Sequence, residues 1–278
     1  MRSILAWIGL IGFCSVCFAD ESADPTWKMA LVGNLNLTQA SFSNWSQGGE
    51  NTLGWQLTFD GRLVWHKGQV EVANRLRLGY GMTQVGEAEA RKSVDELVVE
   101  TICTYRAGLF VDPYVGVGVT TQMGKGYDYQ DSSKVAISDF ADPVYVTQSA
   151  GIGKRYGEVL RSRLGFALKQ TFTDKYPTYS DDPSTEKVEK RRFEVGAELA
   201  ADLNLKLTER ILLTSAFHAF SNLKATNEID VTWDTTLSAK VEKYLAVSLN
   251  VKVVYDRDVS KKRQIKEGLA IGLTYSFI

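Results

Sequence analysis

The chain has 278 residues and a formal net charge of −1, from 32 basic and 33 acidic side chains. This balance gives no basis for nucleic-acid binding, which calls for a basic excess. Hydrophobic residues make up 44% of the chain, and no run of about 18 apolar residues follows the N-terminus, which excludes a helical membrane protein. A β-barrel in a membrane passes this test, because half of each strand faces a polar lumen.

The N-terminus has the pattern of a secretory signal peptide over residues 1–19. Arg2 supplies the positive charge, Ile4–Phe13 the apolar run, and Cys17-Phe18-Ala19 a small-residue cleavage site. The apolar run is shorter than the roughly 20 residues of a spanning helix, so a retained anchor is the weaker alternative. We therefore expect an exported protein whose mature domain covers residues 20–278.

About twelve segments then alternate apolar and polar residues, the pattern of strands with one apolar and one polar face. In chain order they are Trp27–Thr38, Leu53–Trp65, Val70–Met82, Asp95–Arg106, Tyr114–Met123, Val144–Gly153, Leu160–Phe172, Arg192–Leu205, Ile211–Phe220, Ile229–Val241, Leu245–Tyr255 and Ile265–Phe277. The pattern is weak in Val144–Gly153 and apolar on both faces in Ile211–Phe220. The orientation of these two strands is therefore left open.

The clearest of these segments is Arg192–Leu205, in which every second residue from Phe193 is apolar. The residues between them include Glu194, Glu198 and Asp202. At about 3.3 Å per residue this strand is roughly 45 Å long, whereas an ordinary strand has about 5–6 residues. A tilted strand that crosses a bilayer needs about 9–11 residues. The segment therefore predicts a membrane barrel with its apolar side chains in lipid and its charges in the lumen.

The connections between the predicted strands alternate in length. The short ones are Trp65–Gln69, Ala107–Pro113, Lys154–Glu158, Lys206–Arg210 and Val241–Tyr244. The long ones are Asn44–Thr52, Thr83–Ser93, Gly124–Pro143, Thr173–Lys190, Ser221–Glu228 and Asp256–Gln264. Short periplasmic turns, long outer loops and an even strand number are typical of bacterial outer-membrane barrels. The predicted fold class is an all-β, single-chain antiparallel transmembrane β-barrel.

Charged residues on the polar faces are the candidates for the lumen. They are Arg62, Arg75, Arg77, Glu100, Arg161, Arg163, Glu194, Glu198, Asp202, Asp234, Lys240 and Lys252. Opposite charges on neighbouring strands stabilise a sheet, so we expect Arg161 and Arg163 to pair with the acidic residues of Arg192–Leu205. Two interpretations stay open, an ion-lined pore and a polar core that fills a narrow lumen.

The residues that could carry chemistry are few, and we expect no enzyme, cofactor or metal site. The histidines are His66, in a predicted turn, and His218, near Ser215 and Ser221. A Ser–His pair would make a barrel-embedded hydrolase the alternative function. Two distant histidines do not form a metal-ligand cluster. A second alternative is a soluble periplasmic lipid-binding barrel.

The most distinctive loop is Asn44-Trp45-Ser46-Gln47-Gly48-Gly49-Glu50-Asn51, in which Trp45 is a candidate for ligand contact or for packing over the barrel mouth. With this loop the chain resembles a family of bacterial outer-membrane proteins of unknown function, known mostly from Bacteroidetes and green sulfur bacteria. The resemblance rests on an Asn-Trp-x-x-Gly-Gly-x-Asn motif. It continues through Lys92–Leu97, Thr121–Met123, Ser138–Pro143, Trp233, Tyr255-Asp256 and Lys266–Leu269. It implies an outer-membrane barrel and no site residues.

The C-terminal segment Gly272–Ile278 is similar to the signal that the barrel assembly machinery reads in outer-membrane proteins. We therefore expect this machinery and outer-membrane lipid as partners of a monomeric barrel in the Gram-negative outer membrane. The expected function is passive passage of an unspecified solute, or a structural role at the cell surface.

Overall fold

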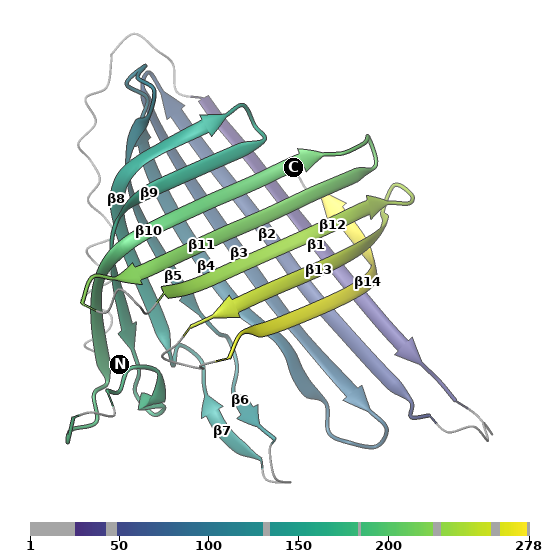
Figure 1. Cartoon of the computed structure of the whole chain (residues 1–278). Coiled ribbons are helices and arrows are strands. Elements are labelled where there is room, and N and C mark those ends of the chain that lie inside the picture. The colour runs from purple at the N-terminus through teal and green to yellow at the C-terminus, as the bar shows by residue number, and fades with distance from the viewer. Residues whose placement is uncertain are drawn as a thin grey trace.

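The computed structural model describes residues 26–42, 49–129, 134–182, 185–224, 229–256 and 262–276. Within these ranges twelve strands form a closed barrel, in the order β1-β14-β13-β12-β11-β10-β9-β8-β5-β4-β3-β2 (Figure 1). They are β1 (Thr26–Ala40), β2 (Thr52–Lys67), β3 (Val70–Val85), β4 (Arg91–Tyr105), β5 (Asp112–Thr121), β8 (Val144–Tyr156), β9 (Leu160–Phe172), β10 (Arg191–Lys206), β11 (Ile211–Asn222), β12 (Ile229–Lys240), β13 (Leu245–Tyr255) and β14 (Gln264–Ser276). The predicted fold class is confirmed. The proposed signal peptide and Trp45 lie outside the described residues.

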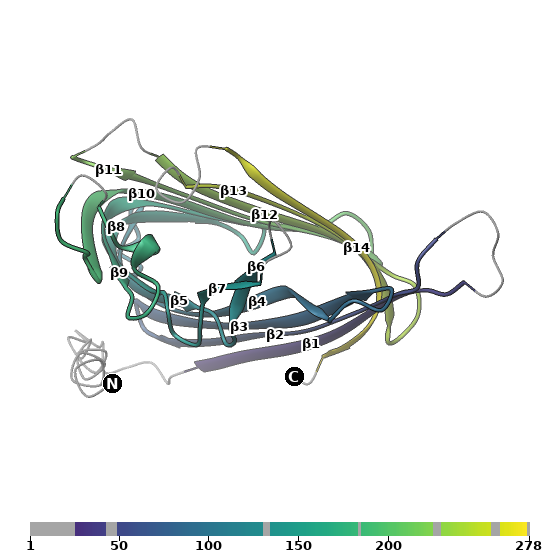
Figure 2. The same ribbon diagram turned by 90° about the horizontal axis from the view of Figure 1, so that it is seen from below.

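All neighbouring strands in the barrel are antiparallel, and β1 closes it by pairing with both β2 and β14. Closure leaves no unpaired sheet edge, which is a requirement for a sheet in lipid. Viewed along its axis, the barrel has an elongated section that is rounded at β8–β10 and narrows toward β14 (Figure 2). No helix within the described ranges has the length and apolar character needed to cross a bilayer.

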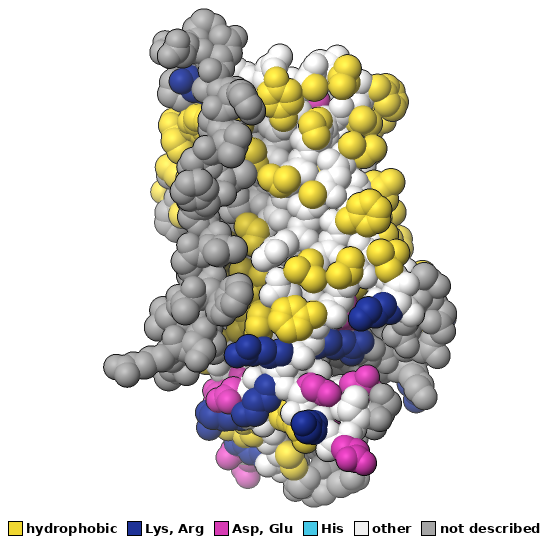
Figure 3. All heavy atoms as spheres, turned by 90° about the vertical axis from the view of Figure 1, so that its left-hand side faces the viewer, with side chains coloured by type: hydrophobic (Ala, Val, Ile, Leu, Met, Phe, Trp, Pro, Cys, Tyr) yellow, Lys and Arg dark blue, Asp and Glu magenta, His cyan; other side chains and the backbone are white. Residues whose placement is uncertain are grey.

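The apolar side chains point away from the barrel axis, as the alternation predicts. On β10, Val195 and Leu199 are 51% and 43% exposed, whereas Glu194 and Glu198 are 5% and 4% exposed. This arrangement inverts that of a soluble barrel, in which the apolar residues fill the interior. Figure 3 shows one wall with apolar side chains over most of its height and charged side chains gathered at its lower end.

The structure resolves the two strands whose orientation was open. On β11, His218 and Phe220 face the lumen: His218 contacts Glu198, and Phe220 is 2% exposed. Phe217 lies on the outer face, where its ring packs edge-on against Trp233 of β12. β8 extends to Tyr156, three residues beyond the predicted end, because its pairing with β9 continues to Leu160.

The predicted alternation of short and long connections fails at two places, β3–β4 and β11–β12. β3 and β4 continue to pair beyond an irregularity at Gly81/Met82, so that their connection spans only residues 86–90. It is therefore no longer than the connection between β4 and β5, residues 106–111, on the opposite end of the barrel. The connection between β11 and β12, residues 223–228, has six residues and is no longer either. The remaining connections on the β3–β4 end are longer than any on the opposite end, and we call this end the long-loop end. We call the opposite end the short-turn end.

A hairpin that the sequence reading missed occupies the long-loop end. β6 (Gly126–Asp128) and β7 (Val135–Ser138) form a separate two-stranded sheet within the connection from β5 to β8. Figure 2 shows it beside the opening of the barrel, where the short 3-10 turn Pro177–Tyr179 of the β9–β10 loop also lies. These loops therefore partly cover the long-loop end, while the short-turn end has only tight connections.

Candidate lumen site

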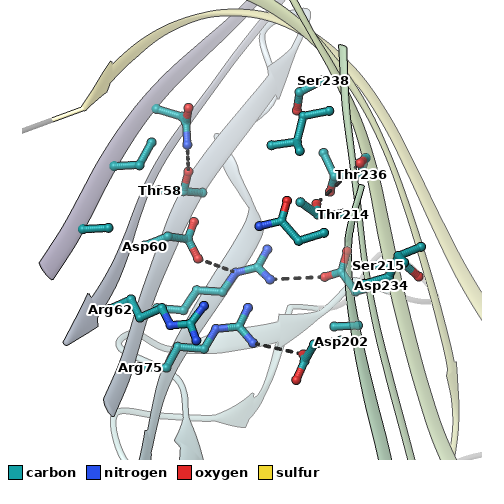
Figure 4. A pocket seen from close by; sticks show the side chains of 18 of the residues that line it. Thr58, Asp60, Arg62, Arg75, Asp202, Thr214, Ser215, Asp234, Thr236 and Ser238 are labelled. Atoms are coloured by element: carbon teal, nitrogen blue, oxygen red, sulfur yellow. Dashed lines mark hydrogen bonds and ion pairs between the residues drawn. The ribbon is translucent and has the colours of Figure 1, made fainter. Parts of the chain in front are cut away.

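The barrel encloses a cavity of about 980 Å³ that reaches the short-turn end, since Glu158, Glu209 and Lys243 of the turns contribute to its lining. Figure 4 shows side chains from β2, β3, β10, β11 and β12 converging on it. Most of the predicted lumen residues line this cavity: Arg62, Arg75, Arg77, Glu100, Arg161, Arg163, Asp202, Asp234, Lys240 and Lys252. The interior is thus neither empty nor filled, because charged side chains surround a substantial open volume.

The two remaining candidates, Glu194 and Glu198, lie nearer the long-loop end and are engaged with neighbouring side chains. Glu198 contacts the His218 imidazole at 3.2 Å and accepts a hydrogen bond from the Tyr114 hydroxyl at 3.4 Å. Glu194 accepts hydrogen bonds from Asn222 at 3.1 Å and from Arg192 at 3.3 Å. Their partners satisfy both buried carboxylates, which would otherwise be costly to desolvate.

Ion pairs cross the lumen at about the middle of the strands. Arg77 of β3 contacts Asp234 of β12 at 3.4 Å, although four strands separate β3 from β12 on one side of the barrel and six on the other. Lys252 of β13 reaches Glu96 of β4 at 3.0 Å in the same way. These contacts join opposite walls of the lumen, and all four residues line the cavity. We call the two pairs the crossbar.

On the long-loop side of the crossbar, acidic groups surround Lys169. Its ammonium lies 2.6 Å from Asp230, 3.8 Å from Asp256 and 3.9 Å from Glu194. These three carboxylates come from β12, from the residue after β13 and from β10, so one lysine connects three separate parts of the wall. This side of the lumen therefore carries more negative than positive charge around Lys169.

On the short-turn side of the crossbar, basic groups prevail around Glu71. The buried Glu71 carboxylate accepts hydrogen bonds from both Arg106, the residue after β4, and Arg155 of β8. Arg163 of β9 contacts Glu100 of β4 at 2.9 Å. The predicted ladder is present in part: Arg161 is the register partner of Asp202 on β10. Arg163 faces Ala200 on β10 and extends across to Glu100 of β4, although Asp202 and Glu198 still lie within its electrostatic range.

Arg155 and Lys266 are among the lumen residues that the sequence candidates omit. Arg155 was assigned to a turn because β8 was predicted to end at Gly153, yet the alternation of inward residues continues through Gly153 to Arg155. Lys266 of β14 also lines the cavity and was not among the candidates. The sequence alternation places both side chains in the lumen, since each lies an even number of residues from the other inward-facing residues of its strand.

The hydrolase alternative depended on a Ser–His pair that the structure does not form. Ser215 and His218 lie on opposite faces of β11, because they are an odd number of residues apart. The Ser215 hydroxyl contacts Thr235 at 2.8 Å and accepts a hydrogen bond from the Trp233 indole at 2.8 Å on the outer face. Among the described residues, no group of three or more His, Cys, Asp and Glu side chains is placed to hold a metal ion.

A closed barrel with an apolar outside and a charged, partly open lumen defines a transmembrane β-barrel protein. The chain belongs to the family described as "Protein of unknown function, DUF481", whose model matches residues 118–277. A second model, "Protein of unknown function (DUF3078)", matches residues 37–127, which include the Asn-Trp-x-x-Gly-Gly-x-Asn loop. A search of curated proteins finds no match.

Solved structures with a similar architecture are outer-membrane barrels. The translocator domain of the autotransporter NalP from Neisseria meningitidis matches with a TM-score of 0.41 and 11% identity, covering 99% of this chain and 95% of that chain. An outer membrane channel from Pseudomonas putida F1 matches with a TM-score of 0.39 and 14% identity, covering 93% of this chain and 97% of that chain. Neither likeness is close enough to assign a function.

Proposed function

We propose that the protein is a passive channel for small charged solutes. The observation that supports this proposal is the cavity of about 980 Å³, which opens at the short-turn end and is surrounded by ionisable side chains from both halves of the barrel. A barrel with a purely structural role needs only a filled interior, and small barrels achieve this with packed side chains. An open, charged volume is the arrangement that a diffusing ion requires.

The lining favours anions, because 14 Lys and Arg residues and 10 Asp and Glu residues surround the cavity. A charged, partly enclosed wall raises the local concentration of ions of opposite sign. The crossbar constricts the lumen, since Arg77–Asp234 and Lys252–Glu96 connect opposite walls. We therefore expect a small conductance with anion preference.

The location and assembly of the channel are part of the same proposal. We place the barrel in the Gram-negative outer membrane as a monomer, with the short-turn end in the periplasm, since short periplasmic turns are the rule for such barrels. Residues 1–19 would direct export, and the C-terminal segment would be read by the barrel assembly machinery. The Asn-Trp-x-x-Gly-Gly-x-Asn loop is proposed as the marker of the subgroup to which the chain belongs.

Planar bilayer recordings of the refolded barrel test this function. We expect discrete steps of conductance, with a reversal potential in a KCl gradient that indicates anion preference. Arg163→Ala should shift this potential toward cations, because it leaves Glu100 without its 2.9 Å partner in the lumen. Phe166→Ala, at a lipid-facing position that is 69% exposed, is the matched control on the same strand.

A barrel that inserts but shows no conductance under any voltage would contradict the channel and favour a structural role at the cell surface. The soluble alternative is tested separately. Leu199 lies on the outer face of β10, so Leu199→Arg should destabilise the barrel in lipid by about 2–4 kcal/mol if this face contacts the bilayer core. A soluble barrel, purified without detergent, would tolerate an exposed arginine at this position.

A further inference from the structure

The short-turn half of the lumen contains two pairs of arginines that lie directly opposite each other on neighbouring strands. Arg62 of β2 is the register partner of Arg75 of β3, and Arg155 of β8 is the register partner of Arg161 of β9. All four line the same cavity. Like charges placed directly opposite each other destabilise a sheet, so these pairs call for a compensating negative charge.

The carboxylates nearby do not supply enough negative charge. Glu71 already accepts hydrogen bonds from Arg106 and Arg155. Asp202 is the register partner of Arg161 and lies 4.0 Å from Arg75, at the outer limit of an ion pair. Glu100 is the register partner of Arg75, but it accepts a hydrogen bond from Arg163 at 2.9 Å. Around these three carboxylates the lumen holds the four paired arginines, Arg106 and Arg163, an excess of basic groups over acidic ones.

Within the described ranges, one buried guanidinium nitrogen of this cluster has no hydrogen-bond partner. Among the described residues, the Nη2 atom of Arg62 is buried and has no hydrogen-bond acceptor. Arg62 lies within electrostatic range of Arg155, Glu71, Asp202 and Arg75. In Figure 4 the guanidinium of Arg62 lies beside that of Arg75, and the dashed line to Asp202 starts from Arg75 alone. A buried donor without an acceptor is costly, so the site is incomplete as it stands.

We propose that this cluster, Arg62, Arg75, Arg155 and Arg161, binds a small oxyanion with two negative charges. The guanidinium fork matches the geometry of phosphate and carboxylate oxygens. Arg155 already donates through both of its Nη atoms to Glu71 and contributes its charge, whereas Arg62 offers an unpartnered donor. A dianion would satisfy the free donor of Arg62 and offset both like-charge pairs. Hydrogen phosphate and a short dicarboxylate share this chemistry.

The position of the cluster relates this binding to transport, and in this respect the proposal rests on the proposed channel function. The cluster lines the cavity that opens at the short-turn end, on the near side of the crossbar. An oxyanion held there would lie between the short-turn opening and the crossbar. The site would then select dianions over chloride by charge and by hydrogen-bond geometry.

Isothermal titration calorimetry on the full barrel, folded in detergent micelles at pH 8 and low ionic strength, tests the site without any measurement of conductance. The probes are inorganic phosphate and succinate, with acetate as the singly charged comparison. We expect saturable binding of at least one dianion and much weaker binding of acetate. Arg62→Gln should lower the affinity about tenfold or more, since it removes a charge-assisted hydrogen bond. Arg62→Lys should give an intermediate loss, because it keeps the charge and loses the fork.

Arg192→Gln is the matched control, because Arg192 lies near the long-loop end of the lumen, where it contacts Glu194 at 3.3 Å. It should change the affinity less than twofold.

Folding of each variant is checked by its heat-modifiable mobility on a gel, and Arg62→Gln should fold because it removes a repulsive pair. The proposal is overturned if neither dianion binds, if acetate binds equally well, or if Arg192→Gln weakens binding as much as Arg62→Gln. If the barrel binds phosphate but does not conduct, the proposed channel function is wrong and the oxyanion site stands. If the barrel conducts but binds neither dianion, the oxyanion site is wrong and the channel function stands.

Discussion

Arg77 of β3 and Asp234 of β12 approach to 3.4 Å from opposite walls of the barrel. Arg77 also lies 2.9 Å from Glu96 and 3.8 Å from Asp60, so a single guanidinium is surrounded by three carboxylates. Lys252 contacts Glu96 from the far wall. The charges of the crossbar are therefore balanced by contacts across the lumen as well as along the wall. The width of the lumen depends on the contacts that cross it.

The first prediction concerns Arg77→Ala. The substitution removes the side chain that crosses the lumen and leaves Asp60, Glu96 and Asp234 facing the opening. We expect a larger single-channel conductance and a shift toward cation preference, because the local charge becomes negative. Recordings in a KCl gradient measure both quantities.

Arg91→Ala is the control for this experiment. Arg91 begins β4 at the long-loop end, where it stacks over the ring of Tyr129 at 4.3 Å and takes no part in the crossbar. An unchanged conductance in Arg77→Ala, or an equal change in Arg91→Ala, would show that the crossbar does not limit the lumen.

The second prediction concerns Glu71→Gln. Glu71 is 4% exposed and accepts hydrogen bonds from Arg106 and Arg155, so its neutralisation leaves two arginines facing each other without a counter-charge. Breaking a buried ion pair on one side costs about 3 kcal/mol or more in free energy of unfolding. We expect a lower urea midpoint in the gel-mobility assay, whereas Glu242→Gln, at the exposed rim, should leave the midpoint unchanged.

The directions of the lumen side chains could be predicted from the sequence, but their ion pairs could not. A strand alternates with a period of two, so Arg62, Glu198 and Asp234 could be placed inside without any knowledge of the register. The choice of partner depends on which strands face each other across the closed barrel. Arg161 faces Asp202 on the next strand, as predicted, whereas Arg163 contacts Glu100 three strands away.

The register between strands explains why the like-charge arginine pairs could not be predicted from the sequence. The opposition of Arg62 to Arg75 and of Arg155 to Arg161 follows from the exact lengths of the turns between their strands. A shift of one residue would move one arginine of each pair to the outer face. Alternation alone does not fix this length, so the like-charge pairs became visible only in the structure.

The third prediction concerns pH and the loops at the long-loop end. Asp139 follows β7 and accepts hydrogen bonds from the Phe140 backbone N–H at 2.9 Å and from Lys175 at 3.1 Å. The backbone hydrogen bond, and after it Lys175, hold the pKa of the Asp139 carboxyl below its ordinary value of 3.8. The same pair raises the pKa of Lys175 above its ordinary value of 10.5.

The directions of these two pKa shifts define the pH range in which the contact between Asp139 and Lys175 stabilises the loops. The lowered Asp139 pKa means that its stabilisation is present above about pH 4 and is lost as the pH falls through the lowered value. The raised Lys175 pKa means that its stabilisation persists up to about pH 10.5 and is lost above it. We expect the Phe140 amide resonance to titrate with a midpoint below 3.8. Lys175→Met should move this midpoint upward, and an unchanged midpoint would contradict the contact.

The fourth prediction concerns the close approach of Tyr114 to two glycines inside the barrel. Tyr114 of β5, Gly151 of β8, Gly165 of β9 and Glu198 of β10 are successive register partners around the wall. The Tyr114 ring therefore lies across the two glycines to reach Glu198 at 3.4 Å, and Tyr114 is 4% exposed. Aromatic rings that cover glycines in this way are a means by which curved sheets keep their register.

A side chain at Gly165 has no space beside this ring. Its Cβ would lie 2.8 Å from the Tyr114 hydroxyl oxygen and even closer to the backbone of Ala150, which cannot move without disturbing the pairing of β8 with β9. We expect Gly165→Ala to lower the yield of folded barrel in detergent and the temperature of its mobility shift. Gly118→Ala is the matched control, because it faces the lumen from β5 and its Cβ would meet no heavy atom closer than 4.0 Å. If both variants fold equally well, the wall tolerates a methyl group under Tyr114, and the close packing of this row does not limit folding.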